Sequence, residues 1–119
     1  MEDGTEIKVV LLGKEEVGKT SIVNRFVNNK FDKELGRTVG GAFSMKQINF
    51  KGQIAKFKIW DTAGQEKFRC LGKMYYQDAQ VCLLVYDVTS EKSLSDLSYW
   101  SNEIKENGPA GHIACVVGN

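Results

Sequence analysis

Residues 13–20 read Gly13-Lys14-Glu15-Glu16-Val17-Gly18-Lys19-Thr20 and fit the pattern G-x-x-x-x-G-K-[ST] of a phosphate-binding loop. The two glycines allow the backbone to curl so that successive N–H groups face one anion. We expect Lys19 to neutralise the outer phosphates and the Thr20 hydroxyl to ligate a magnesium ion that bridges them. A chance match is expected in about 0.4% of chains of this length, so the pattern predicts a phosphate site.

The segments on either side of this loop supply the context that phosphate binding needs. Residues 7–12 form a short apolar, β-branched run and predict a buried strand. Residues 20–28 predict a helix with four apolar side chains on one stripe: Ile22, Val23, Phe26 and Val27. A helix that begins beside Lys19 directs the positive end of its dipole at the same anion.

The rest of the chain predicts an α/β fold. A loop is expected at residues 30–41, and strands at 43–50, 55–60, 81–86 and 113–117, the first two forming a hairpin through Lys51-Gly52-Gln53. The run at 81–86 predicts a strand buried on both faces, and 113–117 another buried strand. A helix is expected after Thr89-Ser90-Glu91, with Leu94, Leu97, Trp100 and Ile104 at helical spacing and a stop at Asn107-Gly108-Pro109. Crossover helices imply a mostly parallel sheet.

Length, composition and charge limit the class of protein. The chain has 119 residues, 42% hydrophobic and 26% charged, which predicts one soluble globular domain and excludes disorder. A net charge of +1 argues against a dedicated nucleic-acid binder. The polar, acidic start and the lack of a long apolar run predict neither a signal peptide nor a membrane span.

The three cysteines are an odd number without metal-type spacing. Cys82 and Cys115 lie within apolar runs and are expected in the core, where cysteine behaves as a small hydrophobe. The third is Cys70; together with the absence of a predicted signal peptide, this cysteine usage indicates a reducing compartment.

A second group of candidate residues follows the strand at 55–60. Asp61 at the end of this strand would meet the magnesium ion from the other side. Gly64 allows a backbone N–H to approach a terminal phosphate, and Gln65 can orient an attacking water without itself being protonated. The alternative is a surface turn capped by Asp61.

These motifs together resemble a small GTPase of the Ras superfamily, over residues 7–119. The resemblance is carried by Gly13–Thr20 and by Trp60-Asp61-Thr62-Ala63-Gly64-Gln65-Glu66-Lys67-Phe68. Similarity to the Rab branch is carried by Thr38-Val39-Gly40-Gly41-Ala42-Phe43, by Tyr75-Tyr76 in the helix after Gln65, and by Leu84-Val85-Tyr86-Asp87-Val88-Thr89. The Ala42-Phe43 pair is most similar to early-endocytic Rab proteins.

The resemblance implies a P-loop, Ras-like three-layer fold that binds GTP or GDP with Mg²⁺. It implies switch I at about residues 30–43 and switch II at about 64–77, both held by the terminal phosphate and released on hydrolysis. Thr38 would ligate magnesium with Thr20 and Asp61, Gln65 would be catalytic, and Phe31 would flank the guanine ring. The alternative for Thr38 is a threonine of the loop without a role in metal binding, and the alternative for Phe31 is a phenylalanine of the core. The implied nucleotide contacts are Gly13, Glu15, Glu16, Val17, Gly18, Lys19, Thr20, Ser21, Phe31, Thr38, Gly64 and Asn119.

The resemblance also implies a monomeric switch for vesicle transport. Its partners would be an exchange factor, a GTPase-activating protein and effectors at the switch regions, but no nucleic acid. It would lie in the cytoplasm and on the cytosolic face of endosome-like membranes, which it would reach only through a lipidated tail. Intrinsic hydrolysis should be slow, and Glu15 should crowd an activating arginine and weaken the partner response. We expect Glu15 and Glu16 to point outward, and Glu16 to adopt a strained backbone angle.

The family reads guanine with an N-K-x-D motif, of which this chain contains only Asn119. Loss of the aspartate would cost about 10²–10⁴ in guanine affinity. We therefore expect an incomplete domain without its C-terminal third, in which the strand at 113–117 is an unprotected apolar edge. The alternative function is a non-hydrolysing fragment that binds partners through residues 43–60 or binds nucleotide weakly. A P-loop kinase or ATPase lacks support because no phosphate-acceptor site is evident.

Overall fold

The computed structural model describes residues 5–14, 16–29, 42–61 and 73–119. Its elements are β1 (Thr5–Leu12), α1 (Lys19–Asn28), β2 (Ala42–Phe50), β3 (Gln53–Asp61), α2 (Lys73–Tyr76), β4 (Val81–Tyr86), α3 (Glu91–Asn107) and β5 (Ile113–Gly118). The strands form one sheet in the order β2-β3-β1-β4-β5, in which only the β2–β3 pair is antiparallel. The predicted α/β class, element order and mostly parallel sheet are confirmed.

The hairpin turn is tighter than the sequence indicates. Phe50 pairs with Gln53, so the loop consists of Lys51 and Gly52 alone, with φ angles of +51° and +81°. Positive φ at both positions is the geometry of a two-residue hairpin turn that matches strand twist. For this reason β3 begins at Gln53, two residues before the predicted start.

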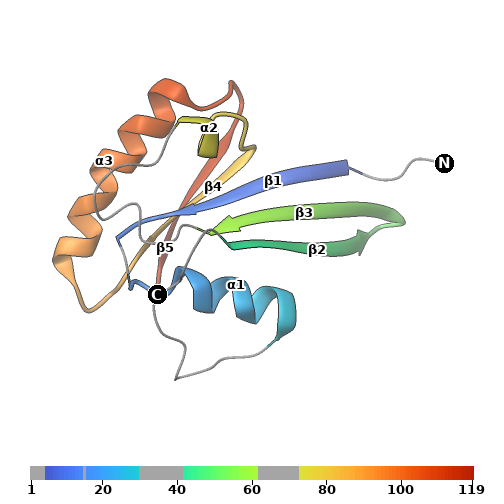
Figure 1. Ribbon diagram of the computed structural model, residues 1–119, viewed down its shortest axis with the longest axis horizontal. Helices are drawn as coiled ribbons and strands as arrows, with labels where there is room; N and C mark the ends of the chain where they lie inside the picture. Colours follow the sequence, from blue (N-terminus) through green and yellow to red (C-terminus); the bar gives the residue numbers. More distant parts are fainter. Residues whose placement is uncertain (1–4, 15, 30–41, 62–72) are drawn as a thin grey trace.

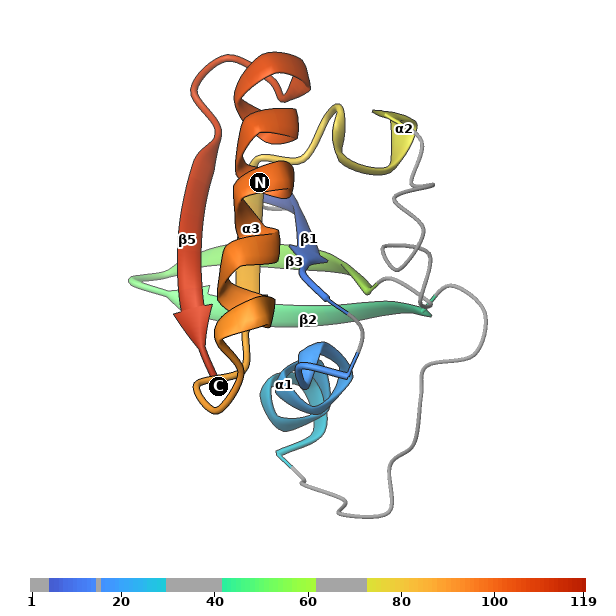
Figure 2. The ribbon, with the colours of Figure 1, turned by 90° about the vertical axis from the view of Figure 1, so that its left-hand side faces the viewer.

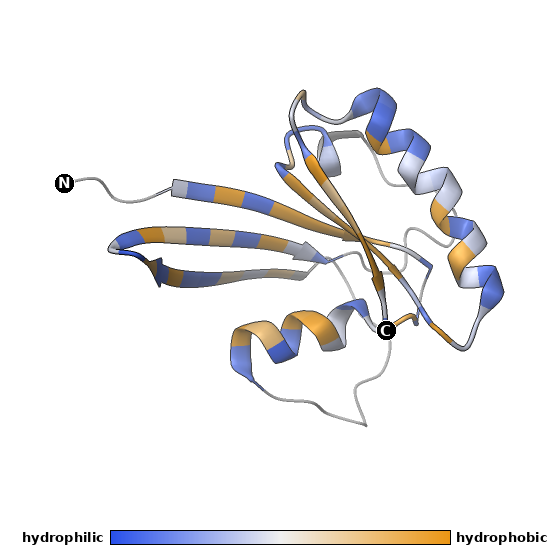
Figure 3. Ribbon diagram, turned by 180° about the vertical axis from the view of Figure 1, so that it is seen from behind, coloured by the Kyte–Doolittle hydropathy of each residue, from blue (hydrophilic) through white to orange (hydrophobic). Residues whose placement is uncertain are grey.

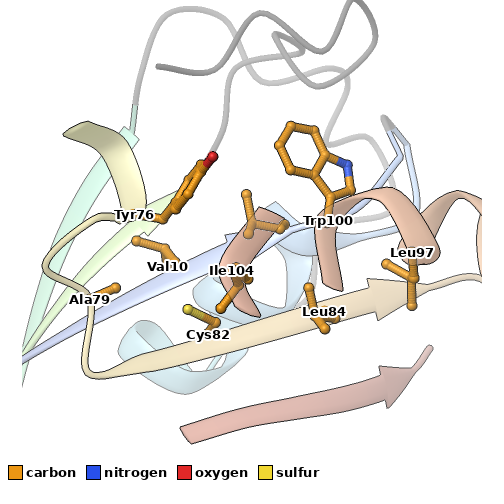
Figure 4. Packing of buried hydrophobic residues seen from close by; sticks show 9 residues of the cluster. Val10, Tyr76, Ala79, Cys82, Leu84, Leu97, Trp100 and Ile104 are labelled. Carbon is orange, nitrogen blue, oxygen red and sulfur yellow. The ribbon is translucent and has the colours of Figure 1, made fainter. Parts of the chain in front are cut away.

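Helices cover both faces of the sheet (Figures 1 and 2). On one face α3 packs against β4, and a cluster that includes Val10, Leu84 and Trp100 fills the space between them (Figure 4). On the other face α1 packs against the sheet through Val23, next to Ile59. These two apolar layers hold β1 in the middle of the sheet, which fixes the position of the loop that follows it.

The first turn of α3 differs from the predicted pattern at one position. Leu94 is exposed, and Ser93 is buried in its place on the stripe that continues with Leu97. The Ser93 hydroxyl donates a hydrogen bond to the Ser90 carbonyl at 2.7 Å and accepts one from the Asp87 N–H at 2.9 Å. Because these bonds satisfy the hydroxyl, a serine can occupy a buried position in the first turn of the helix, three residues after the N-cap Ser90.

β5 is exposed, which corrects the prediction of a buried strand. Ile113 and Val116 are 57% and 61% exposed, and Cys115, predicted in the core, is exposed as well. β5 is the edge strand of the described sheet and pairs only with β4. The expected apolar edge is therefore present. In β4 itself, Val81 and Leu83 are only partly buried, so it is not fully covered on both faces.

A hydrogen bond joins α2 to α3. Tyr76 is 1% exposed, and its hydroxyl donates to Glu103 Oε1 at 2.7 Å. Burial, together with the neighbouring Glu103 carboxylate, raises the pKa of Tyr76 above its ordinary value, so the phenol keeps its proton. The carboxylate that accepts this bond thus holds the end of α2 against α3.

Replacing Tyr76 with phenylalanine should lower the free energy of unfolding by about 1–2 kcal/mol, because a hydrogen bond to a charged group is lost. Urea denaturation followed by circular dichroism measures the change. Glu103→Gln, which keeps an acceptor, should cost less than Glu103→Ala. Equal stability of Tyr76→Phe and the parent would show that the bond contributes nothing.

The two described cysteines should differ sharply in reactivity. Burial raises the pKa of the Cys82 thiol to about 11, whereas Cys115 is exposed. In a Cys70→Ser background, a disulfide reagent at pH 8 should modify one thiol rapidly and the second only on unfolding. Cys115→Ser should remove the rapid phase, and Cys82→Ser should leave it. Since the Cys82 pKa is raised on folding, its contribution to stability should fall as the pH rises from 9.0 towards 11.

Candidate functional site

The loop between β1 and α1 curls as its sequence predicts. Gly13 and Gly18 have φ angles of +148° and +99°. A Cβ atom on Gly13 would lie 2.2 Å from the carbonyl oxygen of Val85, so only glycine fits there. Glu16 is exposed and has φ +65°, which confirms its outward direction and its strained backbone. Glu15 lies outside the described residues.

Lys19 is buried within this loop although it carries a charge. It is 5% exposed, and its Nζ donates hydrogen bonds to the carbonyls of Gly13 at 3.2 Å and Lys14 at 2.9 Å. α1 begins at this residue, with Gly18 at the N-cap and neither a side-chain cap nor an acid in its first turn. The N–H groups at the start of the helix and the ammonium group of Lys19 are both positive, and they suit an anion at the loop. Ser21, in the same turn, is partly buried.

Two oxygen-bearing side chains from different elements meet beside the loop. The hydroxyl of Thr20 on α1 donates a hydrogen bond to Oδ2 of Asp61 at the end of β3. Asp61 is 2% exposed and pairs in register with Leu11 of β1, which brings the carboxylate to the start of the phosphate loop. A buried carboxylate and a hydroxyl are hard oxygen donors, so the pair fits Mg²⁺.

Asn119 makes a contact that sequence reasoning missed. Its side-chain Nδ2 donates to the carbonyl of Val17 at 2.9 Å, and its own carbonyl accepts from the N–H of Val88 at 2.9 Å. A Cβ on Gly18 would lie 2.0 Å from Asn119 Nδ2. Asn119 therefore fastens the phosphate loop to the end of β5, next to α1 (Figure 1). A motif match alone carries no signal for this contact, because it depends on the path of two distant segments.

Two exposed aromatic rings lie on the β2–β3 hairpin. Phe43 and Trp60 are 48% and 37% exposed, with ring centroids 4.7 Å apart, and Lys8 Nζ lies 5.5 Å from the Trp60 ring. Trp60 directly precedes Asp61 on β3, and Phe43 of β2 pairs with Trp60 in the sheet. Because side chains alternate along a strand, the rings form an apolar surface on the face of the sheet opposite to the side chain of Asp61.

The remaining predicted site residues, Phe31, Thr38, Gly64 and Gln65, lie outside the described residues, as do most of switch I and switch II. A pocket of about 530 Å³ is lined by residues that include Asp78, Gln80 and His112. It lies at the start of β4 and β5, at the opposite end of these strands from the phosphate loop. The structure thus brings together Gly13, Lys19, Thr20, Asp61 and Asn119.

Comparisons with known proteins agree with the resemblance. Residues 8–119 match the model of the Ras family. The chain is 44% identical over 114 residues to Ras-related protein Rab-22A of Homo sapiens and to Ras-related protein Rab-31 of Rattus norvegicus, covering 96% of this chain and 59% and 58% of theirs. It is 48% identical over 113 residues to GTP-binding protein YPT53 of Saccharomyces cerevisiae, covering 95% of this chain and 51% of that one. The chain thus spans between half and three-fifths of these relatives.

The contact between Gly18 and Asn119 can be tested by a double-mutant cycle. Gly18→Ala should destabilise the fold by about 2–3 kcal/mol, because it adds both a disfavoured φ and a collision. Asn119→Ala should cost about 1 kcal/mol for the lost hydrogen bond. The double variant should lose less than the sum in urea denaturation, since truncation of Asn119 removes the collision. Strict additivity would contradict the contact.

Proposed function

The chain belongs to the Ras family and to its Rab branch, and from this premise we propose that it is a GTP-binding and GTP-hydrolysing switch that regulates intracellular vesicle transport. The observation that carries the proposal is the convergence of Lys19, Thr20 and Asp61 at one edge of the sheet. Lys19 supplies positive charge for phosphate, and Thr20 and Asp61 supply hard oxygens for a cation.

In the proposed complex, the chain's own groups bind the phosphates. The ammonium group of Lys19 and the N–H groups at the start of α1 neutralise and orient them. Thr20, Asp61 and Thr38 would hold Mg²⁺, which when bound would supply positive charge at the phosphate oxygens. The burial of Asp61 and its hydrogen bond to Thr20 support this assignment. Val17 and Ser21 complete the loop around the nucleotide.

Hydrolysis in this proposal depends on residues beyond the described ranges. Gln65 orients the attacking water, and the N–H of Gly64 donates to the terminal phosphate. Thr38 and Gly64 release the switch segments when that phosphate leaves. Phe31 flanks the guanine ring, and Asn119 lies next to the guanine base. The contact of Asn119 with Val17 supports a placement of the base next to the phosphate loop.

The partners proposed for this switch are proteins that bind near the site. The exposed pair of Phe43 and Trp60, which face each other across the β2–β3 hairpin, supports a docking surface for effectors, an exchange factor or a GTPase-activating protein. Every helix among the described residues is too short or too polar to cross a membrane. We propose that the protein acts on the cytosolic face of endosome-like membranes.

A second candidate is a chain that binds partners or nucleotide weakly without hydrolysis. The exposed apolar side chains of Ile113 and Val116 favour it, because an uncovered edge strand weakens the element that carries Asn119. Analysis of the nucleotide that co-purifies with the chain separates the two functions. Stoichiometric GDP supports the switch, and an empty or aggregated protein supports the second candidate.

Lys19→Ala should weaken binding of a fluorescent GDP analogue in the presence of Mg²⁺ by about 100-fold, because two or more charge-assisted contacts to phosphate are lost. Fluorescence titration measures the dissociation constant. Lys105→Ala, which removes an exposed charge from α3, should leave it unchanged. Tight binding by Lys19→Ala would contradict the proposed phosphate site.

A further inference from the structure

Among the described residues of the phosphate loop, Glu16 alone combines a positive φ angle with a side chain. Its φ is +65°, and the loop's other positive angles belong to Gly13 and Gly18. Elsewhere the described chain places non-glycine residues at positive φ only at the end of a helix, Asn29, and in a two-residue hairpin turn, Lys51. A side chain at such an angle costs stability, because its Cβ crowds the carbonyl oxygen that follows. Glu16 therefore carries backbone strain at a position where glycine would carry none.

Contacts on both sides of Glu16 hold this angle in place. Gly13 lies so close to Val85 that a Cβ atom would be 2.2 Å from the carbonyl oxygen. Val17 is 4% exposed in the apolar cluster that α1 shares with the sheet, and its carbonyl accepts a hydrogen bond from Asn119 at 2.9 Å. Figure 3 shows apolar residues at the end of β1 and along α1, the two elements that the loop joins. Because these contacts all lie within the chain, the cost of the strained angle falls on the stability of the fold.

The carboxylate of Glu16 places a negative charge on a loop whose backbone and ammonium group suit an anion. Glu16 precedes the buried Lys19 by three residues, so their Cα atoms lie within about 11 Å of each other. Two unit charges about 10 Å apart in water change a binding constant by about twofold. A diphosphate carries more than one negative charge, so its repulsion by the carboxylate is larger than for a single pair. The effect is electrostatic, and salt at about 0.1 M and above screens it over this distance.

We propose that Glu16 lowers the affinity of the phosphate loop for nucleotide and speeds the release of the nucleotide. The inference rests on the proposed function, because it takes a nucleoside diphosphate or triphosphate as the ligand of this loop. The two properties of Glu16 act on different quantities. Its carboxylate weakens the binding of the phosphates, whereas its strained φ angle weakens the fold. Glu16 thereby favours exchange of the nucleotide over its retention.

Two substitutions at Glu16 separate the charge from the strain. Glu16→Gln removes the charge and keeps the strained angle, whereas Glu16→Gly removes both. In about 0.05 M salt, both variants should bind a fluorescent GDP analogue about three- to fivefold more tightly than the parent and release it more slowly by the same factor. The gain should fall below about twofold in about 0.5 M salt. In urea denaturation after removal of bound nucleotide, Glu16→Gly should have a higher midpoint than Glu16→Gln, because only glycine relieves the strain.

Matched variants on other elements serve as controls. Glu106→Gln removes an exposed acid from the end of α3, and Lys51→Gly relieves a φ angle of +51° in the hairpin turn. Both should bind the GDP analogue with the dissociation constant of the parent. Unchanged or weaker binding by Glu16→Gln would overturn the inference, and so would a gain that salt does not reduce or a gain confined to Glu16→Gly. Absence of binding in the parent and in every variant would instead contradict the proposed function, and the inference with it.

Discussion

The phosphate loop packs so closely against its neighbours that two of its positions have no room for a side chain. At Gly13 the loop passes under the carbonyl of Val85 on β4, and at Gly18 it meets the amide of Asn119 after β5. These contacts bring the loop against two strands beyond β1 itself. The positions of Lys19 and of the first turn of α1 follow from this curl, because the helix begins directly after Gly18. The site thus depends on backbone packing before it depends on any charged side chain.

The element order and the phosphate loop could be predicted because their signals are local. A β-branched run, a glycine pair and a capped amphipathic helix each fix the conformation of a few neighbouring residues. The meeting of Thr20 with Asp61 could also be expected, since the carboxyl ends of neighbouring parallel strands lie at one edge of a sheet. The contact of Asn119 with Val17 could not be predicted. It joins residues 102 positions apart, and an asparagine amide can occur in any loop.

The wrong predictions of burial in β5 and α3 have a common physical cause. Apolar patterns show that a side chain can be buried, but not which element will cover it. Val116 and Cys115 lie in an apolar run, yet both are exposed, because no element of the described residues covers them. Leu94 fits a helical stripe, but Ser93 takes the buried place because the turn before α3 satisfies its hydroxyl. Burial at these positions is decided by tertiary neighbours rather than by local sequence.

The same packing couples ligand binding to the stability of the fold. A nucleotide that contacts Lys19, Thr20 and Asp61 would join β1, α1 and β3, and Asn119 ties the end of β5 to the same loop. A ligand that binds only the folded chain adds about 2.7 kcal/mol of stability at a concentration 100 times its dissociation constant. The exposed edge strand makes this gain important, because β5 is held by β4 along one side and by Asn119 at its end. Binding at the phosphate loop should therefore stabilise the strand that is least covered, although that strand lies at the far edge of the sheet from β3.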